Sequence, residues 1–185
     1  MIKKIGIAIV VLIVAVLAYS ATKPDTFTIQ RTATINAPPD RIFPFINDLH
    51  SFGSWSPYEK RDPQMKRTYS GPPFGQGAVY AWDGNSDVGQ GTMEIVQSTP
   101  PSEVRLKLDF IRPFEGHNTA VFTLVPQGSS STNVTWAMHG ESPYISKVLS
   151  TFINFDKMIG SDFETGLTNL KTLAEAPPTK TNVGA

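Results

Sequence analysis

Three histidines are the candidate acid–base groups of this 185-residue chain, which contains no cysteine. Without cysteine, disulfides, thiolate metal sites and cysteine nucleophiles are excluded. His117 is the strongest candidate, because Glu115 lies two residues before it and a neighbouring carboxylate supports a general base. A hydrogen-bonded hairpin turn explains the same residues and is favoured. His139 is out of register with the apolar residues of its strand, and His50 precedes a polar loop, so both are predicted to lie at the surface. No catalytic residue is assigned.

A calcium-loop pattern is the second candidate site. Asp83, Asn85, Asp87 and Glu94 occupy positions one, three, five and twelve of such a loop. Position six is Val88, where the sharp turn needs glycine, and the flanking residues alternate as strands rather than helices. A hairpin turn is therefore predicted here. The sequence predicts neither a metal site nor a cofactor.

The balance of charge argues against nucleic acid as a partner. The chain has 16 basic and 16 acidic residues, so no broad positive field attracts phosphates. Its length suits one good hydrophobic core and is short for two. Eleven phenylalanines and three tryptophans supply large apolar side chains for that core.

An uncharged aliphatic run from 5 to 22 follows Lys3 and Lys4. About 18 residues in a helix extend roughly 27 Å, close to the hydrocarbon thickness of a bilayer. Residues 1–23 are therefore predicted to be a membrane anchor and linker in the cell (inner) membrane. The lysine pair should stay in the cytoplasm, which places the remaining chain on the periplasmic side. In the alternative, Ala18-Tyr19-Ser20 marks a signal-peptide cleavage site, and the domain is exported and soluble.

The chain from 24 to 175 changes to patterns of strands and one long helix. Apolar and polar residues alternate from 26 to 35 and again in short segments between 65 and 140, which predicts an antiparallel sheet with one polar face. From Ser142-Pro143 onward, apolar residues recur every three or four positions, which predicts an amphipathic helix. That helix would exceed the width of the domain, so a bend is expected near 154–156 or at Gly160. Residues 176–185 are predicted to be a disordered tail.

Four segments of this domain carry a family resemblance: Ala37-Pro38-Pro39, Trp55-Ser56-Pro57, Tyr69-Ser70-Gly71-Pro72 with Gly75–Trp82, and Asp156–Gly160 with Phe163-Glu164. They are similar to segments of the bacterial polyketide cyclase/dehydrase and lipid transport group of the Bet v 1-like, START-related (SRPBCC) superfamily. The resemblance covers about residues 26–175. It implies an α+β helix-grip fold, in which a curved antiparallel sheet of about seven strands surrounds a long C-terminal helix.

The helix-grip fold implies a space between the sheet and the C-terminal helix, which is expected to form an apolar ligand pocket. Any one of its lining residues could instead fill a dry core, and for a single residue that role is favoured. Arg31 and His117 are polar candidates for the pocket, although a bulge or a strand end explains Arg31 better. The apolar candidates are Tyr80, Trp82, Phe110, Phe122, Trp136, Met138, Phe152, Phe155 and Phe163.

These features predict a membrane-anchored binding domain for a lipid or other small hydrophobic molecule. An enzyme of the polyketide cyclase/dehydrase type, acting in the same cavity, is the alternative, and Arg31, Tyr80 or His117 would supply its polar groups. A protein-interaction module, similar to the activator domains of a heat-shock ATPase, is a third hypothesis. Export across the membrane disfavours it, since that ATPase is cytosolic.

Overall fold

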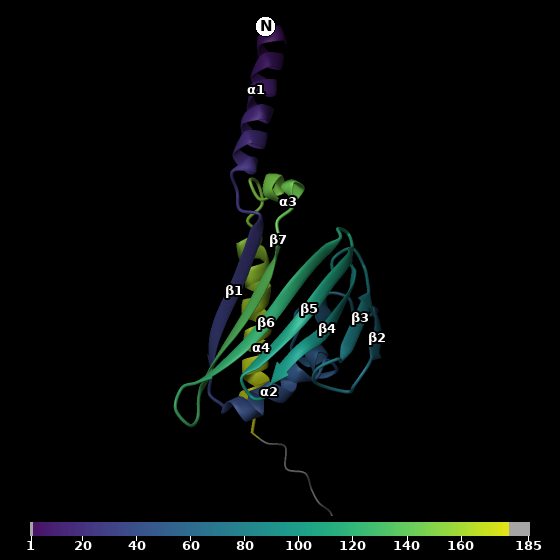
Figure 1. Ribbon diagram of the computed structural model, residues 1–185, viewed down its shortest axis with the longest axis vertical. Coiled ribbons are helices and arrows are strands. Elements are labelled where there is room, and N and C mark those ends of the chain that lie inside the picture. The colour runs from purple at the N-terminus through teal and green to yellow at the C-terminus, as the bar shows by residue number, and fades with distance from the viewer. Residues whose placement is uncertain (1, 178–185) are drawn as a thin grey trace, which may run out of the picture.

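A seven-stranded antiparallel sheet forms the body of the computed structural model, which describes residues 2–177 (Figure 1). The strand order is β1-β7-β6-β5-β4-β3-β2, so the strands from β2 to β7 form a meander and β1 pairs with β7. This confirms the predicted helix-grip sheet. The strands are β1 (Thr26–Ile35), β2 (Lys66–Ser70), β3 (Val79–Asp83), β4 (Gln90–Thr99), β5 (Glu103–Arg112), β6 (Gly116–Pro126) and β7 (Thr132–Glu141).

Local sequence explains the faces and the curvature of the sheet. In β5, Val104 and Leu106 are buried while Lys107 is exposed, as their alternation predicts. The register between β4 and β5 shifts at two places, near Gly91 and after Ile95, and such irregularities bend a strand. Gly91 also lets a bulky ring approach, since a Cβ there would lie 2.5 Å from the Trp82 side chain. The sheet therefore curves around its apolar face.

The C-terminal helical region is two helices, α3 (Tyr144–Leu149) and α4 (Phe155–Glu175). The predicted bend is a complete break over residues 150–154, and Asn154 caps α4 by accepting a hydrogen bond from the Lys157 backbone N–H at 2.9 Å. Gly160 lies inside α4 and does not interrupt it. The tail predicted over 176–185 lies outside the described residues from 178 onward.

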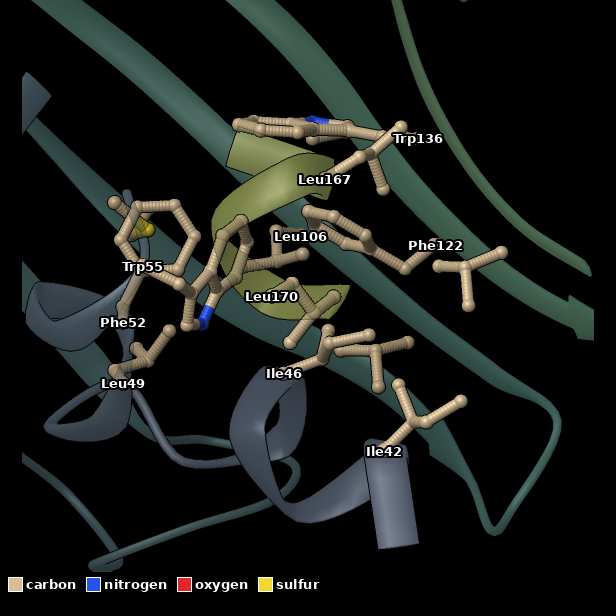
Figure 2. Packing of buried hydrophobic residues seen from close by; sticks show 14 of the residues in the cluster. Ile42, Ile46, Leu49, Phe52, Trp55, Leu106, Phe122, Trp136, Leu167 and Leu170 are labelled. Atoms are coloured by element: carbon tan, nitrogen blue, oxygen red, sulfur yellow. The ribbon is translucent and has the colours of Figure 1, made fainter. Parts of the chain in front are cut away.

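One end of the space between α4 and the sheet is filled by a dry core (Figure 2). There the short helix α2 (Pro39–Asn47) places Ile42 and Ile46 against Leu170 of α4, and all three side chains are essentially inaccessible. Trp55 is also fully buried, and its indole N–H donates to the Phe45 carbonyl at 2.9 Å. The 3-10 turns η1 (Ser51–Ser54) and η2 (Tyr58–Lys60) flank Trp55 and lead the chain back to the sheet.

The N-terminal helix α1 (Ile2–Ala21) projects away from the sheet (Figure 1). It has a mean hydropathy of 2.4 and is 6% buried, so by length and composition it is a candidate signal anchor or signal peptide. Its last turns contact α3: the Tyr144 hydroxyl donates to the Leu17 carbonyl at 2.8 Å. Just after α1, the Lys23 ammonium donates to the hydroxyls of Ser150 and Thr151 at 2.9 and 3.0 Å.

Candidate ligand-binding cavity

A cavity of about 410 Å³ lies between the inner face of the sheet and the first half of α4. Most of its wall is apolar, and strands β3 to β7 contribute residues to it together with the segment before β2, the β3–β4 hairpin and α4. Predicted residues on that wall are Tyr80, Trp82, Phe110, Phe122, Trp136, Met138 and Phe163.

Trp136 forms the boundary between the cavity and the dry core. Its ring stacks on Phe163 of α4 with centroids 4.1 Å apart, and it contacts the ring of Phe122 at 5.0 Å. Gly166 permits this packing, because a Cβ there would lie 2.7 Å from the Trp136 ring. The side of these packed rings that faces α2 is covered by buried apolar residues of the core. The side that faces the start of α4 borders the cavity.

Phe152 and Phe155, which the sequence places in the pocket, do not line the cavity. Phe152 lies in the connector between α3 and α4 and is 73% exposed. Phe155 is half-buried at the first position of α4, one turn before Met158 and Ile159, which line the cavity. The break between the helices is the cause, because it interrupts the stripe that a continuous helix would have presented to the sheet.

Arg31 lies at neither a bulge nor a strand end, and it does not line the cavity. It pairs in register with Trp136 in the middle of β1 and reaches across α4 to Asp156 at 3.0 Å and Glu164 at 2.8 Å. The guanidinium passes over Gly160, where a Cβ would lie 1.9 Å from its Nη2 atom. Its hydrogen bonds lower the pKa of the Asp156 carboxyl. Arg31 therefore attaches α4 to the sheet.

His117 is 70% exposed on the outer face, where its Nδ1 lies 2.7 Å from Asp109 of the neighbouring strand. Lys107 and His117 together lower the pKa of the Asp109 carboxyl. His117 follows the turn of the β5–β6 hairpin and does not line the cavity. His139 is also exposed, with Nδ1 2.9 Å from the Thr28 hydroxyl.

The calcium-loop residues form the hairpin between β3 and β4. Asp83 pairs with Arg112 of β5 at 2.5 Å, and the Asn85 side chain accepts from the Asp87 backbone N–H at 2.9 Å. The Trp82 indole N–H donates to the Val88 carbonyl at 3.0 Å. This bond holds the β3–β4 hairpin beside the cavity, which both residues line. Asp83 and Asn85 of the pattern thus have structural partners.

Sequence reasoning predicted Tyr80 but missed its polar neighbours, of which Glu59 also lines the cavity. The Tyr80 hydroxyl donates to Glu59 of η2 at 2.5 Å, and Arg67 pairs with the other oxygen of that carboxylate at 2.6 Å. Burial, reinforced by the Glu59 carboxylate, raises the pKa of Tyr80 far above its ordinary value. Its hydroxyl therefore stays protonated and acts as a hydrogen-bond donor.

A second polar group comes from the same irregular segment. Tyr58 lies beside Asp162 of α4, which pairs with Arg61, and burial together with the Asp162 charge raises the pKa of Tyr58. Ser56 is completely buried on the wall, and its hydroxyl has no hydrogen-bond partner within residues 2–177. The Trp55-Ser56-Pro57 resemblance pointed to this segment, but no periodic pattern indicated which way its side chains face.

Comparison with known proteins identifies the family. Residues 26–175 match the sequence profile described as polyketide cyclase/dehydrase and lipid transport. The chain belongs to this family. The match covers the residues that carried the resemblance in the sequence. No curated protein matches the chain.

Solved structures share the fold of this family member at low sequence identity. A protein from Chromobacterium violaceum is 15% identical, with a TM-score of 0.57 over 84% of this chain and 100% of that chain. Norcoclaurine synthase from Thalictrum flavum, solved with dopamine and hydroxybenzaldehyde, is 12% identical, with a TM-score of 0.57 over 80% and 86% of the two chains. The di-domain ARO/CYC BexL from the BE-7585A biosynthetic pathway is 17% identical, with a TM-score of 0.57 over 87% and 54%. These likenesses show the fold.

Proposed function

We propose that this family member binds a lipid or another small hydrophobic molecule in the cavity between the sheet and α4. The single observation that carries the proposal is the cavity itself. Its volume of about 410 Å³ and its mainly apolar wall agree with the usual size and character of small-molecule pockets. Membership of the polyketide cyclase/dehydrase and lipid transport family supports a small hydrophobic ligand.

The polar groups on the wall define the ligand further. The buried Ser56 hydroxyl has no protein partner among the described residues, and leaving such a group unsatisfied costs about 1–3 kcal/mol. A ligand atom that hydrogen-bonds to it removes this cost. A ligand with an apolar body and at least one polar atom supplies this partner if the side chains that cover the Ser56 hydroxyl move aside on binding.

The helix α1 supports the proposal that the cavity is held at a membrane. Its length and hydropathy suit a bilayer span. The pair Lys3 and Lys4 precedes the apolar run, so the positive-inside rule keeps the N-terminus in the cytoplasm and the cavity on the other side. A signal peptide that is removed after export is the competing fate of α1.

Native mass spectrometry of the full chain in nanodiscs, beside a titration with a fluorescent fatty acid, tests the binding function. We expect one bound molecule per chain and saturable binding of the probe. Ser56→Ala should retain the fold and weaken binding of a polar-headed probe by about tenfold, since one buried hydrogen bond contributes roughly 1–1.5 kcal/mol. The matched control is Ser70→Ala, an exposed serine at the end of β2. The absence of any bound molecule and of probe binding would contradict the proposal.

Catalysis in the same cavity is a second candidate function, favoured by the contact between Tyr80 and Glu59. To act on a bound polyketone, the Tyr80 hydroxyl would turn its single O–H from Glu59 to a substrate carbonyl oxygen and polarise that carbonyl by hydrogen bonding, since its raised pKa keeps the proton on the phenol. Turnover of such a substrate by the wild type and its loss in Tyr80→Phe, with binding retained, is the result expected of an enzyme. Tight binding without turnover would favour the carrier.

A further inference from the structure

Large apolar side chains are exposed together at the end of the domain that carries α1. Ile145 of α3 is 61% exposed, and Phe152 in the following connector is 73% exposed. Phe114, in the turn between β5 and β6, is 73% exposed, and Met158 in the first turn of α4 is 53% exposed. We call these four residues the apolar rim.

The sheet register places these segments at the same end of the molecule. Asn118 pairs with Gly140, so the β5–β6 turn, just before β6, lies beside the end of β7 that leads into α3. Figure 1 shows this turn, α3 and the start of α4 on the side from which α1 projects. Four apolar side chains from separate segments thus surround one edge of the domain.

Contacts with α1 determine the level of α3 along the apolar span. The Tyr144 hydroxyl reaches the carbonyl of Leu17, which lies four residues before the end of α1, about 6 Å along a helix. The helix α3 is therefore level with the last turn of the span rather than beyond it. Tyr19 is exposed there and the Lys23 ammonium lies 5.3 Å from its ring, and such tyrosines and lysines are typical of the membrane interface.

The cavity is accessible from this same end. Its exposed lining residues include Asp87 in the β3–β4 hairpin, Arg112 at the end of β5 and Met158 in the first turn of α4. At the opposite end, Ile46 of α2 packs against Leu170 of α4, and both are essentially inaccessible. Met158 belongs both to the cavity wall and to the apolar rim.

We infer that the apolar rim docks into the interface of the membrane that holds α1, so that the cavity mouth faces lipid and the ligand enters directly from the bilayer. The inference rests on the proposed function and adds the surface and the route of loading. The partner is a lipid surface, because the rim lies beside an apolar span and at the depth of its end. Interfacial apolar side chains typically bury 5–10 Å into the headgroup boundary, which matches the level of α3.

The depth of the rim can be measured on the full chain because the protein has no cysteine. Single variants Phe152→Cys, Phe114→Cys and Val125→Cys, each labelled with a polarity-sensitive fluorophore, are reconstituted into phosphatidylcholine vesicles that contain a quencher lipid. Val125 is the matched control, an exposed apolar residue near the far end of β6. We expect at least threefold stronger quenching at 152 and 114 than at 125. Equal quenching at the three positions would overturn the inference.

Uptake of a fluorescent fatty acid tests the route. The double variant Ile145→Asp, Phe152→Asp should slow uptake from the vesicle by at least fivefold, while Val125→Asp should not. Affinity at equilibrium should be unchanged within twofold, because neither rim residue of the double variant lines the cavity. Unchanged uptake in the double variant would overturn the route.

The two proposals fail in different ways. A wild type that binds no probe from vesicles or from detergent defeats the binding function, while quenching at 152 and 114 still decides whether the rim is in the membrane. A wild type that binds the probe but shows no quenching above that at 125 defeats the membrane docking alone.

Discussion

A substitution that fills part of the cavity distinguishes a ligand pocket from a closed core. Ala120 lies on β6, in register with Leu106 and Met138, and all three residues line the cavity. In Ala120→Phe, the added ring takes up about 100 Å³, the volume of three to four water molecules in the liquid. That is roughly a quarter of the cavity of about 410 Å³.

The lost space determines the expected loss of affinity. A chain-like ligand would lose the burial of about three methylene groups, and at about 0.8 kcal/mol each this amounts to roughly 2.4 kcal/mol. The dissociation constant for a fluorescent fatty acid should therefore rise about 60-fold. The fold should be retained, because the new ring occupies existing space.

Ala174→Phe is the matched control, since Ala174 is fully buried near the end of α4 and does not line the cavity. Here the same ring meets packed side chains, and overpacking costs about 1–3 kcal/mol. At roughly 3 °C per kcal/mol, the melting temperature should fall by about 3–9 °C. Binding by the folded protein should be unchanged.

The assay combines probe titration with thermal unfolding of the full chain in nanodiscs, followed by tryptophan fluorescence. Wild-type affinity in Ala120→Phe would refute the placement of the ligand beside β6. A fall in melting temperature as large as that of Ala174→Phe would show that the space closes in solution, and the reasoning from cavity to carrier would then be wrong.

Further outcomes follow from the same contacts. Gly166→Ala should lower the free energy of unfolding by about 1–3 kcal/mol, since its Cβ meets the rigid ring of Trp136. Gly160→Ala should lower it by less than about 1 kcal/mol, because the flexible end of the Arg31 side chain can move and alanine favours the helix. Chemical denaturation compares these two variants. The raised pKa of Tyr80 means that the folded state keeps a proton that the unfolded state loses near pH 10. Stability from this group is complete below pH 10 and should fall by about 1.4 kcal/mol by pH 11, a loss that Tyr80→Phe removes in unfolding titrations. A C-terminal alkaline phosphatase fusion should be active outside the cytoplasm; activity only of a cytoplasmic reporter would reverse the proposed topology.

The regular elements were predictable because their patterns are local. Alternation places Leu106, Phe122 and Trp136 on one face of the sheet whatever the partner strands are, and the structure has all three on that face. The apolar span before Lys23 is likewise a property of consecutive residues, and it forms the helix α1. The helix-grip fold followed from the order of these elements and from the family resemblance.

The site depended on contacts between distant segments. Phe152 lies outside the predicted pocket because α3 ends at Leu149 and α4 begins only at Phe155, and α3 packs against α1 rather than continuing along the sheet. Arg31 lies on the face of β1 that α4 covers and pairs there with Asp156 and Glu164, which are more than 100 residues away in the sequence. No local pattern reports such a partner.

The polar residues on the cavity wall also depend on contacts between distant segments. Ser56 and Glu59 lie in an irregular segment whose side chains have no period, so only its packing between α4 and the sheet turns them toward the cavity and toward Tyr80. The sequence by itself determined which residues form strands and helices and which strand faces are apolar, because both depend on near neighbours. Tertiary structure decided where the helix breaks, which polar groups reach the cavity and which end of it opens, because each results from contacts between segments far apart in the chain.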